Sequence, residues 1–179
     1  MKIYTKKGDG GETSLFSGRR TAKSDPFVAA VGDLDELSAA LGLASVAYPV
    51  IAGELRAIQH ILYVIGAILS AEGTRSEFAV ADAEIEKLER AIDAASDGLP
   101  ELRDFIYPGE SEASSRLHMA RAIARRAERS AAALGDPVPA AVLAYLNRLS
   151  DLLFVWARQA DFAAGHGENL LAGDKHRAG

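Results

Sequence analysis

The sequence predicts an all-α protein, a single bundle of long helices. Alanine and leucine are abundant among its 179 residues, whereas aromatic residues make up only 7%, and this composition favours helices that pack closely together. Long segments place apolar residues three and four positions apart, which is the spacing of one helix face. Proline, glycine and aspartate residues separate these segments, as is typical of helix ends. A chain of this length suits one domain with a sizeable core.

The end signals divide most of the chain into helices. Asp25 is placed to cap the first helix, and Pro26 lies in its first turn. The predicted helices cover about 26–48, 50–72, 80–96, 111–134 and 140–164. The second is apolar almost all round, which predicts deep burial, whereas the third has the single apolar face of a surface helix. The last is apolar on more than one face and should contact both its own core and a neighbour.

Composition disfavours or excludes several classes of function. The net charge of −5 and a pI near 5.4 disfavour a general nucleic-acid-binding surface. The lack of cysteine excludes disulfides, thiolate metal sites and a cysteine nucleophile. The longest apolar run, Ile61–Leu69, is too short to cross a bilayer, and the N-terminus lacks the apolar core of a secretory signal. We therefore expect a cytoplasmic protein that binds neither nucleic acid nor membrane.

The segment 111–134 carries the strongest chemical signal. On a helix that Ser111 caps, one polar stripe is formed by His118, Arg121, Arg125 and Glu128. Guanidinium groups one turn apart can each bind phosphate oxygens with two hydrogen bonds, so this stripe suits the phosphate chain of a nucleotide. A solvated helix face with Arg–Glu pairs is the alternative that this helix alone leaves open.

Residues 1–23 form the only long stretch without helical periodicity. After a short extended piece at 2–5, the loop 6–14 combines glycines with lysines and hydroxyl residues. Such a loop can wrap a phosphate, because glycine lets backbone N–H groups approach an anion closely. It is neither a Walker A loop nor a dinucleotide fingerprint. A flexible N-terminal arm is the alternative.

Three acids share one turn of the first predicted helix: Asp33, Asp35 and Glu36. They could form a solvated face, a metal site, or the counter-charges of Arg121 and Arg125. We interpret Lys7, Arg126 and Arg129 as surface charges or pairing partners.

The connection 97–110 is unusually apolar, with the sequence FIYPG at 105–109. It should pack onto the bundle or line a pocket for a flat, apolar ligand. In the last helix, Asn147 and Asp151 lie one turn apart within an apolar surface, so both should hydrogen-bond to specific partners. Residues 165–179 are expected to be a loose tail.

Other chemistries find little support. No Glu-x-x-His pair of a di-metal bundle occurs, and no serine lies in a nucleophile elbow. The four histidines are scattered without the spacing of metal ligands: His60, His118, His166 and His176. The residues alone therefore indicate an all-α bundle with an anion-binding pocket, built from the N-terminal loop and the arginine helix.

Four separated motifs add a family resemblance. They read TKKGDGGETSL at 5–15, GDLDEL at 32–37, LHMAR at 117–121 running into RRAER at 125–129, and YLNRLSD at 145–151. In this order and at these separations they resemble the PduO-type ATP:cob(I)alamin adenosyltransferases over most of the chain. The resemblance implies a five-helix bundle that assembles as a homotrimer, with one active site at each subunit interface.

The implied domain is 1–179, divided into a nucleotide-binding loop at 1–23, the bundle at 24–164 and the tail at 165–179. Of the five ranges given above, we count four as long helices. The fifth helix of the family is therefore expected to be short or to lie in a segment predicted as a loop.

The resemblance also implies roles for individual residues. ATP is held by the N-terminal segment of one subunit and by helix residues at the interface, and the matching positions are Thr5, Lys6, Gly8, Asp9, Gly11, Thr13, Ser14, Lys23, Arg121, Arg125, Glu128 and Asn147. Asp35 matches an acid that pairs with the first arginine of the stripe across the interface. Phe105 matches a phenylalanine that lies against the lower face of the corrin ring, although a plain packing role is the alternative.

The implied reaction is attack of Co(I) of a reduced cobalamin on the 5′ carbon of ATP, which yields adenosylcobalamin and triphosphate. Charge on the leaving group calls for cations, which Mg²⁺ and the arginines and lysines of the site would supply, although no Mg²⁺ ligand is identified. An adenosylcobalamin-dependent mutase is a candidate partner. The competing class is a non-catalytic nucleotide sensor or an adenosylcobalamin-delivery chaperone.

Three positions depart from the family pattern. The apolar loop has Tyr107 where leucine is usual and Glu110 where glycine is usual, and Ser38 stands where asparagine is usual. Glu110 adds negative charge near a pocket meant for anions, so the departures concern mainly the corrinoid side.

Overall fold

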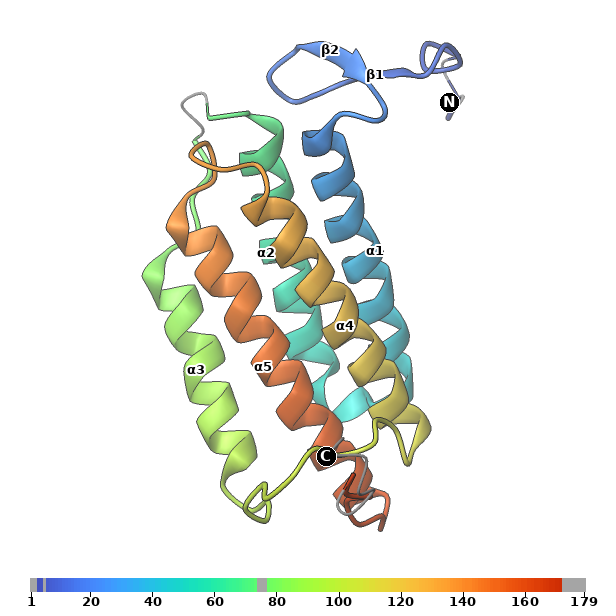
Figure 1. Cartoon of the computed structure of the whole chain (residues 1–179), viewed down its shortest axis with the longest axis vertical. Helices are drawn as coiled ribbons and strands as arrows, with labels where there is room; N and C mark the ends of the chain where they lie inside the picture. The colour runs from blue at the N-terminus through green and yellow to red at the C-terminus, as the bar shows by residue number, and fades with distance from the viewer. Residues whose placement is uncertain (1–2, 5, 74–76, 172–179) are drawn as a thin grey trace, which may run out of the picture.

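The computed structural model describes residues 3–4, 6–73 and 77–171 and is mostly helical (Figure 1). Its elements are β1 (Glu12–Ser14), β2 (Arg20–Ala22), α1 (Pro26–Ala47), the 3₁₀ helix η1 (Pro49–Ile51), α2 (Ala52–Ser70), α3 (Asp82–Ser96), α4 (Glu112–Ala132) and α5 (Ala140–Ala163). The all-α prediction is confirmed, with only a minimal two-stranded sheet added. The five α-helices coincide with the five predicted ranges. Our count of four was therefore wrong, and no fifth helix has to be sought in a loop.

The helix starts follow their local signals. The Asp25 side chain accepts a hydrogen bond from the backbone N–H of Phe27 at 2.9 Å and caps α1. In the same way, Ser111 caps α4 by accepting from the N–H of Ser114 at 3.1 Å. Each cap satisfies a backbone donor that has no partner inside the helix.

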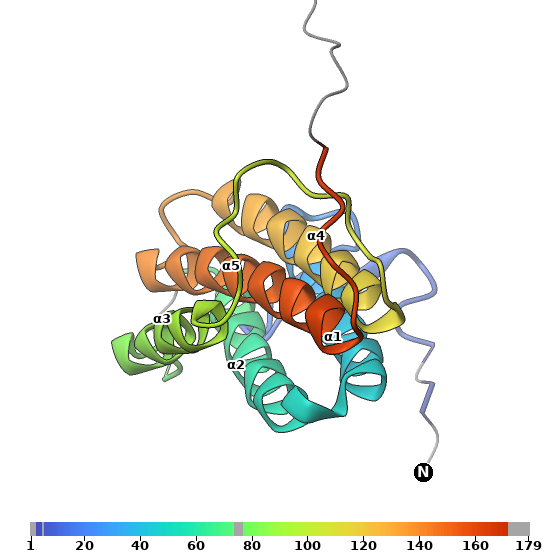
Figure 2. The same ribbon diagram turned by 90° about the horizontal axis from the view of Figure 1, so that it is seen from below.

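The core is centred on α4 and α5. α4 packs between α1 and α5, α5 also packs against α3, and α2 makes its main helix contact with α1 (Figure 2). Leu117, Leu146, Leu149 and Leu153 are fully buried along the α4–α5 contact. Each such leucine stabilises the fold by about 1.5–3 kcal/mol relative to an exposed side chain. The prediction that α5 contacts both its own core and a neighbouring helix is confirmed.

The predicted deep burial of α2 is wrong. Leu55, Leu62 and Leu69 face the core, but Tyr63 on the other side is 75% exposed. The reason is position: α2 lies at the edge of the bundle, so no other helix among the described residues covers its second apolar face. The longest uninterrupted apolar run was judged too short to cross a membrane. By length and composition, however, two helical segments are long and apolar enough: Pro49–Ser70 and Ala140–Ala163. That finding is weak evidence, because core helices such as α5 pass the same test.

Residues 12–22 form an antiparallel hairpin where the sequence predicted only a loop. Glu12 pairs with Ala22 and Ser14 with Arg20, and Gly18 has a φ of +83° in the turn between the strands. The strands escaped prediction because three residues each are too few to show alternation.

The hairpin is tethered to the bundle by one arginine. Arg19 forms ion pairs with Asp25, at the start of α1, and with Glu72, just after α2. The Ser17 N–H also donates to the Ser70 carbonyl at 3.2 Å. The hydrogen bond from Arg19 is the main cause that lowers the pKa of the Glu72 carboxyl. This tether holds the hairpin at the end of the bundle where α1 begins (Figure 1).

The expectation of a loose tail is wrong for residues 165–171. Ile106 and Leu170 form an antiparallel bridge, and the N–H of Tyr107 donates to the carbonyl of Asn169 at 2.8 Å. Backbone pairing between segments far apart in the chain carries no local sequence signal. Residues 172–179 of the predicted tail lie outside the described residues.

A buried ion pair strengthens this attachment. The side chain of Arg158 in α5 is 7% exposed and pairs with Glu168, which is 11% exposed. Arg158 also donates to the carbonyl of Pro100 at 2.6 Å. The loop between α3 and α4 and the segment after α5 are therefore held together against the bundle.

Candidate functional site

Arg121 and Arg125 lie one turn apart on α4, as predicted. Arg121 is half-buried and Arg125 is exposed, and within the described part of the chain neither meets a carboxylate. Desolvation, followed by the charge of Arg125, lowers the pKa of Arg121, yet a guanidinium group stays charged at neutral pH. The described part of one chain therefore presents two adjacent cations without a paired carboxylate.

Two of the three clustered acids form ion pairs with a different arginine. Arg126 binds Asp33 at 3.0 Å and also pairs with Glu36, which joins α4 to α1. Ser130 donates to the second oxygen of Asp33 at 2.6 Å. The pairing role expected for Arg126 is confirmed. Among the residues that the structure describes, no group of three histidine, aspartate or glutamate side chains could hold a metal ion.

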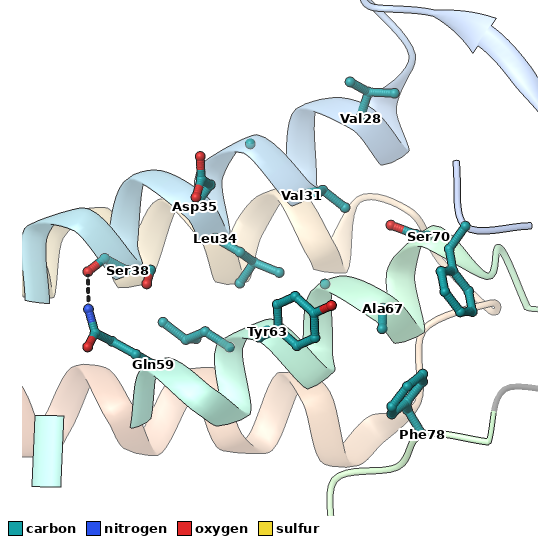
Figure 3. A pocket seen from close by; sticks show the side chains of 14 residues that line it. Val28, Val31, Leu34, Asp35, Ser38, Gln59, Tyr63, Ala67, Ser70 and Phe78 are labelled. Atoms are coloured by element: carbon teal, nitrogen blue, oxygen red, sulfur yellow. Dashed lines mark hydrogen bonds between the residues drawn. The ribbon is translucent and has the colours of Figure 1, made fainter. Parts of the chain in front are cut away.

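Asp35, the third acid, points to another surface. It is exposed and lines a pocket of about 520 Å³ between α1 and α2, away from the arginine stripe of its own chain. Figure 3 shows Asp35 and Ser38 on α1, and Gln59 and Tyr63 on α2, along the sides of this pocket. Gln59 donates to the Ser38 carbonyl at 2.8 Å. Asp35 is therefore available to a cation from outside the chain.

Glu128 and Asn147 meet beside the stripe. The Asn147 Nδ2 donates to Glu128 Oε1 at 3.1 Å, and Arg148 donates to the Asn147 Oδ1 at 3.0 Å. The prediction of specific partners is correct for Asn147. It is wrong for Asp151, whose side chain is exposed and has no hydrogen bond to the described residues.

A second pocket, of about 270 Å³, joins the apolar loop to the arginine helix. Its lining consists of Leu102, Asp104, Phe105, Ile106, Pro108, His118, Arg121 and Phe154. The Phe105 side chain is 80% exposed, so it does not have the packing role that was its alternative. His118, expected on the polar stripe, is only 5% exposed and packs edge-on against Phe154 with ring centres 5.9 Å apart.

The predicted N-terminal site residues are grouped around the hairpin. The Lys23 N–H donates to the Gly11 carbonyl at 2.8 Å, and a side chain at Gly8 would lie 3.4 Å from the Lys23 Nζ. The positive φ of Gly11, +81°, explains why glycine is used there. The other described members, Lys6, Asp9, Thr13 and Ser14, are exposed or half-buried nearby, whereas Thr5 lies outside the described residues.

The loop and the arginine stripe do not meet within one chain. The hairpin extends beyond the end of α1, whereas Arg121 and Arg125 lie midway along α4 (Figure 1). A single pocket built from both, as predicted from the residues, is therefore not formed by one copy of the chain.

Comparison with known proteins identifies the family. A family model described as cobalamin adenosyltransferase matches residues 3–160. This chain belongs to the cobalamin adenosyltransferase family. The corrinoid adenosyltransferase PduO of Citrobacter freundii is 44% identical over 96% of this chain but only 53% of its own length, so the chain spans about half of that relative. The corrinoid adenosyltransferase of Bacillus subtilis is 40% identical over 94% of this chain and 91% of its own length.

Solved adenosyltransferase structures share the fold. A phenylalanine-to-histidine variant of a PduO-type ATP:corrinoid adenosyltransferase from Lactobacillus reuteri, complexed with cobalamin and ATP, superposes with a TM-score of 0.91. It is 34% identical and covers 96% of this chain and 97% of its own. An arginine-to-lysine variant complexed with ATP has a TM-score of 0.88 at 35% identity, over 94% of this chain and 99% of its own. The resemblance to PduO-type enzymes is confirmed.

Two groups near the candidate site were not predicted. One is the Arg19–Glu72 tether, whose members are 53 positions apart and share no local pattern. The other is the buried bond between Ser114 and Asp161, which lies behind His118. The spacing of Ser114 and His118, one turn apart on a helix, was a usable signal for the second group.

Proposed function

We propose that this chain transfers the 5′-deoxyadenosyl group of ATP to Co(I) of a reduced corrinoid, releasing triphosphate. One observation carries the proposal: Arg121 belongs both to the pocket with Phe105 and to the stripe with Arg125. A corrin ring against Phe105 and a phosphate chain along the stripe would bring the 5′ carbon between them. Family membership and relatives solved with cobalamin and ATP support the same assignment.

The reaction requires stabilisation of the negative charge that develops on the triphosphate leaving group. The electron pair of Co(I) forms the cobalt–carbon bond, while the bond between the 5′ carbon and oxygen breaks and its electrons leave with triphosphate. Arg121 and Arg125 would stabilise that developing charge without reorganising. The protein transfers no proton in this step, so no general base is required. Mg²⁺ would enter bound to the phosphates of ATP rather than in a protein cage.

The remaining nucleotide contacts are assigned to Thr5, Lys6, Gly8, Asp9, Gly11, Thr13, Ser14, Lys23, Glu128 and Asn147. We infer a homotrimer in which the loop of one subunit meets the stripe of the next, and Asp35 pairs with Arg121 of the adjacent copy. Support comes from the separation of loop and stripe within one chain and from the exposed face of α2 at Tyr63. A cytoplasmic location and transfer of product to a mutase belong to this proposal, as does the division into 1–23, 24–164 and 165–179.

A non-catalytic nucleotide sensor or adenosylcobalamin carrier is the second candidate. The observation that favours it is Glu110, an exposed acid close in sequence to Phe105 where the family pattern has glycine. A negative charge near the corrinoid pocket could weaken catalysis while leaving the nucleotide contacts intact.

The test is an absorbance assay with cobalamin, a strong reductant, Mg²⁺ and ATP that follows the loss of Co(I). We expect ATP-dependent formation of a light-sensitive alkylcobalamin. Arg125→Ala should slow it about a hundredfold, the scale expected when one preorganised charge-stabilising group is removed. Arg90→Ala is the control, because Arg90 is exposed on α3 and pairs with Glu86. Tight ATP binding without any conversion would instead support the sensor or carrier.

A further inference from the structure

A buried polar group lies directly behind Arg121. Ser114 and His118 are one turn apart on α4, and Asp161 is on α5; their exposed fractions are 0%, 5% and 6%. The Ser114 hydroxyl donates to Asp161 Oδ2 at 2.6 Å. A carboxylate buried this deeply needs partners for both oxygens, so the second oxygen of Asp161 calls for another donor.

The hydrogen bond between Arg121 and His118 determines which imidazole nitrogen carries the hydrogen. The Arg121 Nε–H lies 3.3 Å from the His118 Nδ1. A guanidinium group has only donors, so Nδ1 must be the acceptor and carry no hydrogen. The ring is then neutral, with its hydrogen on Nε2.

Asp161 is the nearby acceptor that this Nε2–H could use, since its charge acts on the His118 ring. The His118 ring packs against Phe154, and Asp161 follows two turns later on the same face of α5. Asp161 is in turn bonded to Ser114, one turn from His118. In the described part of the chain, His118 Nε2 and Asp161 Oδ1 are the buried side-chain atoms without a hydrogen-bond partner, and one is a donor and the other an acceptor. A slight ring rotation or one bridging water would satisfy both.

We propose that Ser114, Asp161 and His118 form a hydrogen-bonded relay that orients the guanidinium group of Arg121. The relay holds the Nε–H and leaves the four N–H groups on the two terminal nitrogens for an anion. His118 is thus a positioning residue that acts through Arg121. Its effect on turnover rests on the proposed function, whereas the state of its ring does not.

The surrounding charges are consistent with a neutral ring. Burial, together with Arg121, lowers the pKa of His118 to about 4, although Asp161 acts in the opposite direction. Asp104 from the apolar loop is the other charged residue that lines the same pocket. The ring should therefore remain neutral throughout the pH range in which the assay is run.

Kinetics of matched variants test the positioning role. His118→Phe keeps the ring shape but removes both nitrogens, so kcat should fall about tenfold while KM for ATP stays nearly constant, because Arg125 and the loop still bind ATP. His118→Asn restores an acceptor close to the position of Nδ1 and should recover most of the loss. His166→Phe, at an exposed histidine just after α5, is the control. An unchanged kcat in folded His118→Phe would overturn the proposal.

Nitrogen-15 NMR of the imidazole tests the relay without turnover. The wild-type His118 ring should show a hydrogen on Nε2 and none on Nδ1 from pH 7 down to about pH 5. Ser114→Ala, which removes one hydroxyl group from the relay, should alter the Nε2 resonance and lower kcat. A cationic ring or a hydrogen on Nδ1 at pH 7 would overturn the relay. If the wild-type protein makes no alkylcobalamin, the function fails, but the NMR result still decides the relay.

Discussion

Phe105 is a large apolar side chain that the fold leaves in solvent, at the rim of a pocket shared with Arg121. Its backbone is nevertheless held on both sides: its carbonyl accepts from the Leu171 N–H at 2.7 Å, and its N–H donates to Asp104 at 2.8 Å. A fixed backbone with an exposed ring is an arrangement suited to an apolar ligand.

Replacing Phe105 should impair turnover without impairing ATP binding. Phe105→Ala should leave ATP affinity nearly intact and sharply slow turnover with cob(II)alamin and reductant. The reason is that an apolar wall excludes water from the lower face of the cobalt and so favours the four-coordinate state that is reduced most easily. Tyr107→Ala, in the same loop but outside the pocket lining, is the control. Equal turnover in Phe105→Ala and wild type would contradict this role.

His118 predicts a loss of stability in acid. Its pKa is about 4 in the folded protein against 6.5 for the free side chain. As the pH falls below 6.5 the unfolded chain binds a proton, whereas the folded chain does so only near pH 4. The free energy of unfolding should therefore fall over this window, by at most about 3 kcal/mol.

Urea unfolding at pH 7 and at pH 4.5 measures this contribution. Carboxylates also make the stability of every variant depend on pH. The informative quantity is therefore the difference between variants in the unfolding free energy lost from pH 7 to pH 4.5. His118→Asn should lose less stability than wild type between the two pH values, whereas His166→Asn, at an exposed site, should behave like wild type. Equal losses in wild type and His118→Asn would show that His118 titrates normally.

At the level of secondary-structure elements, local chemistry was readable and tertiary pairing was not. Asp25 and Ser111 mark helix starts because a cap acts within three residues, and the one-turn spacing of Arg121 and Arg125 holds on any α-helix. The exposed side of α2 depends on what lies next to it. The bridge between Ile106 and Leu170 joins segments that no local pattern relates.

The same distinction applies to the candidate site. The four motifs contain most of the residues predicted for it, apart from Lys23 and Phe105, because each motif is contiguous in sequence. The surface that Asp35 faces, and the burial of His118, follow only from packing.

The hairpin tether predicts a local effect. Arg19→Ala removes the ion pairs to Asp25 and Glu72, so residues 12–22 should exchange amide hydrogens faster and KM for ATP should rise. Arg90→Ala is the control, since Arg90 is exposed on α3 and pairs with Glu86, away from the hairpin. Unchanged exchange in Arg19→Ala would show that the strand pairing alone holds the hairpin in place.

At the scale of the whole molecule, the site should be shared between subunits. Each chain supplies a glycine-rich loop at one place and the Arg121–Arg125 stripe at another. In a ring of identical copies joined head to tail, each interface combines different surfaces of two subunits.

Mixing two inactive variants tests this sharing. Arg125→Ala has an impaired stripe, and the double variant Lys6→Ala/Lys23→Ala lacks the two lysines assigned to the nucleotide. Co-expressed subunits should regain about a quarter of wild-type activity, because that share of head-to-tail interfaces joins an intact loop to an intact stripe. Each variant alone serves as the control. No recovery in verified mixed assemblies would place loop and stripe in the same chain.

The long α3–α4 connection is held at two points, which lowers the conformational entropy that it would lose when a ligand binds. Arg158 holds this connection at Pro100, and the bridge to Leu170 holds it at Ile106, so its chain is divided into short closed spans. Short closed spans have few alternative conformations, and most of their conformational entropy is lost on folding. A corrinoid that arrives would meet a loop already in place, with only the Phe105 side chain left to settle. A corrinoid should therefore bind to a preformed site, without closure of a mobile loop.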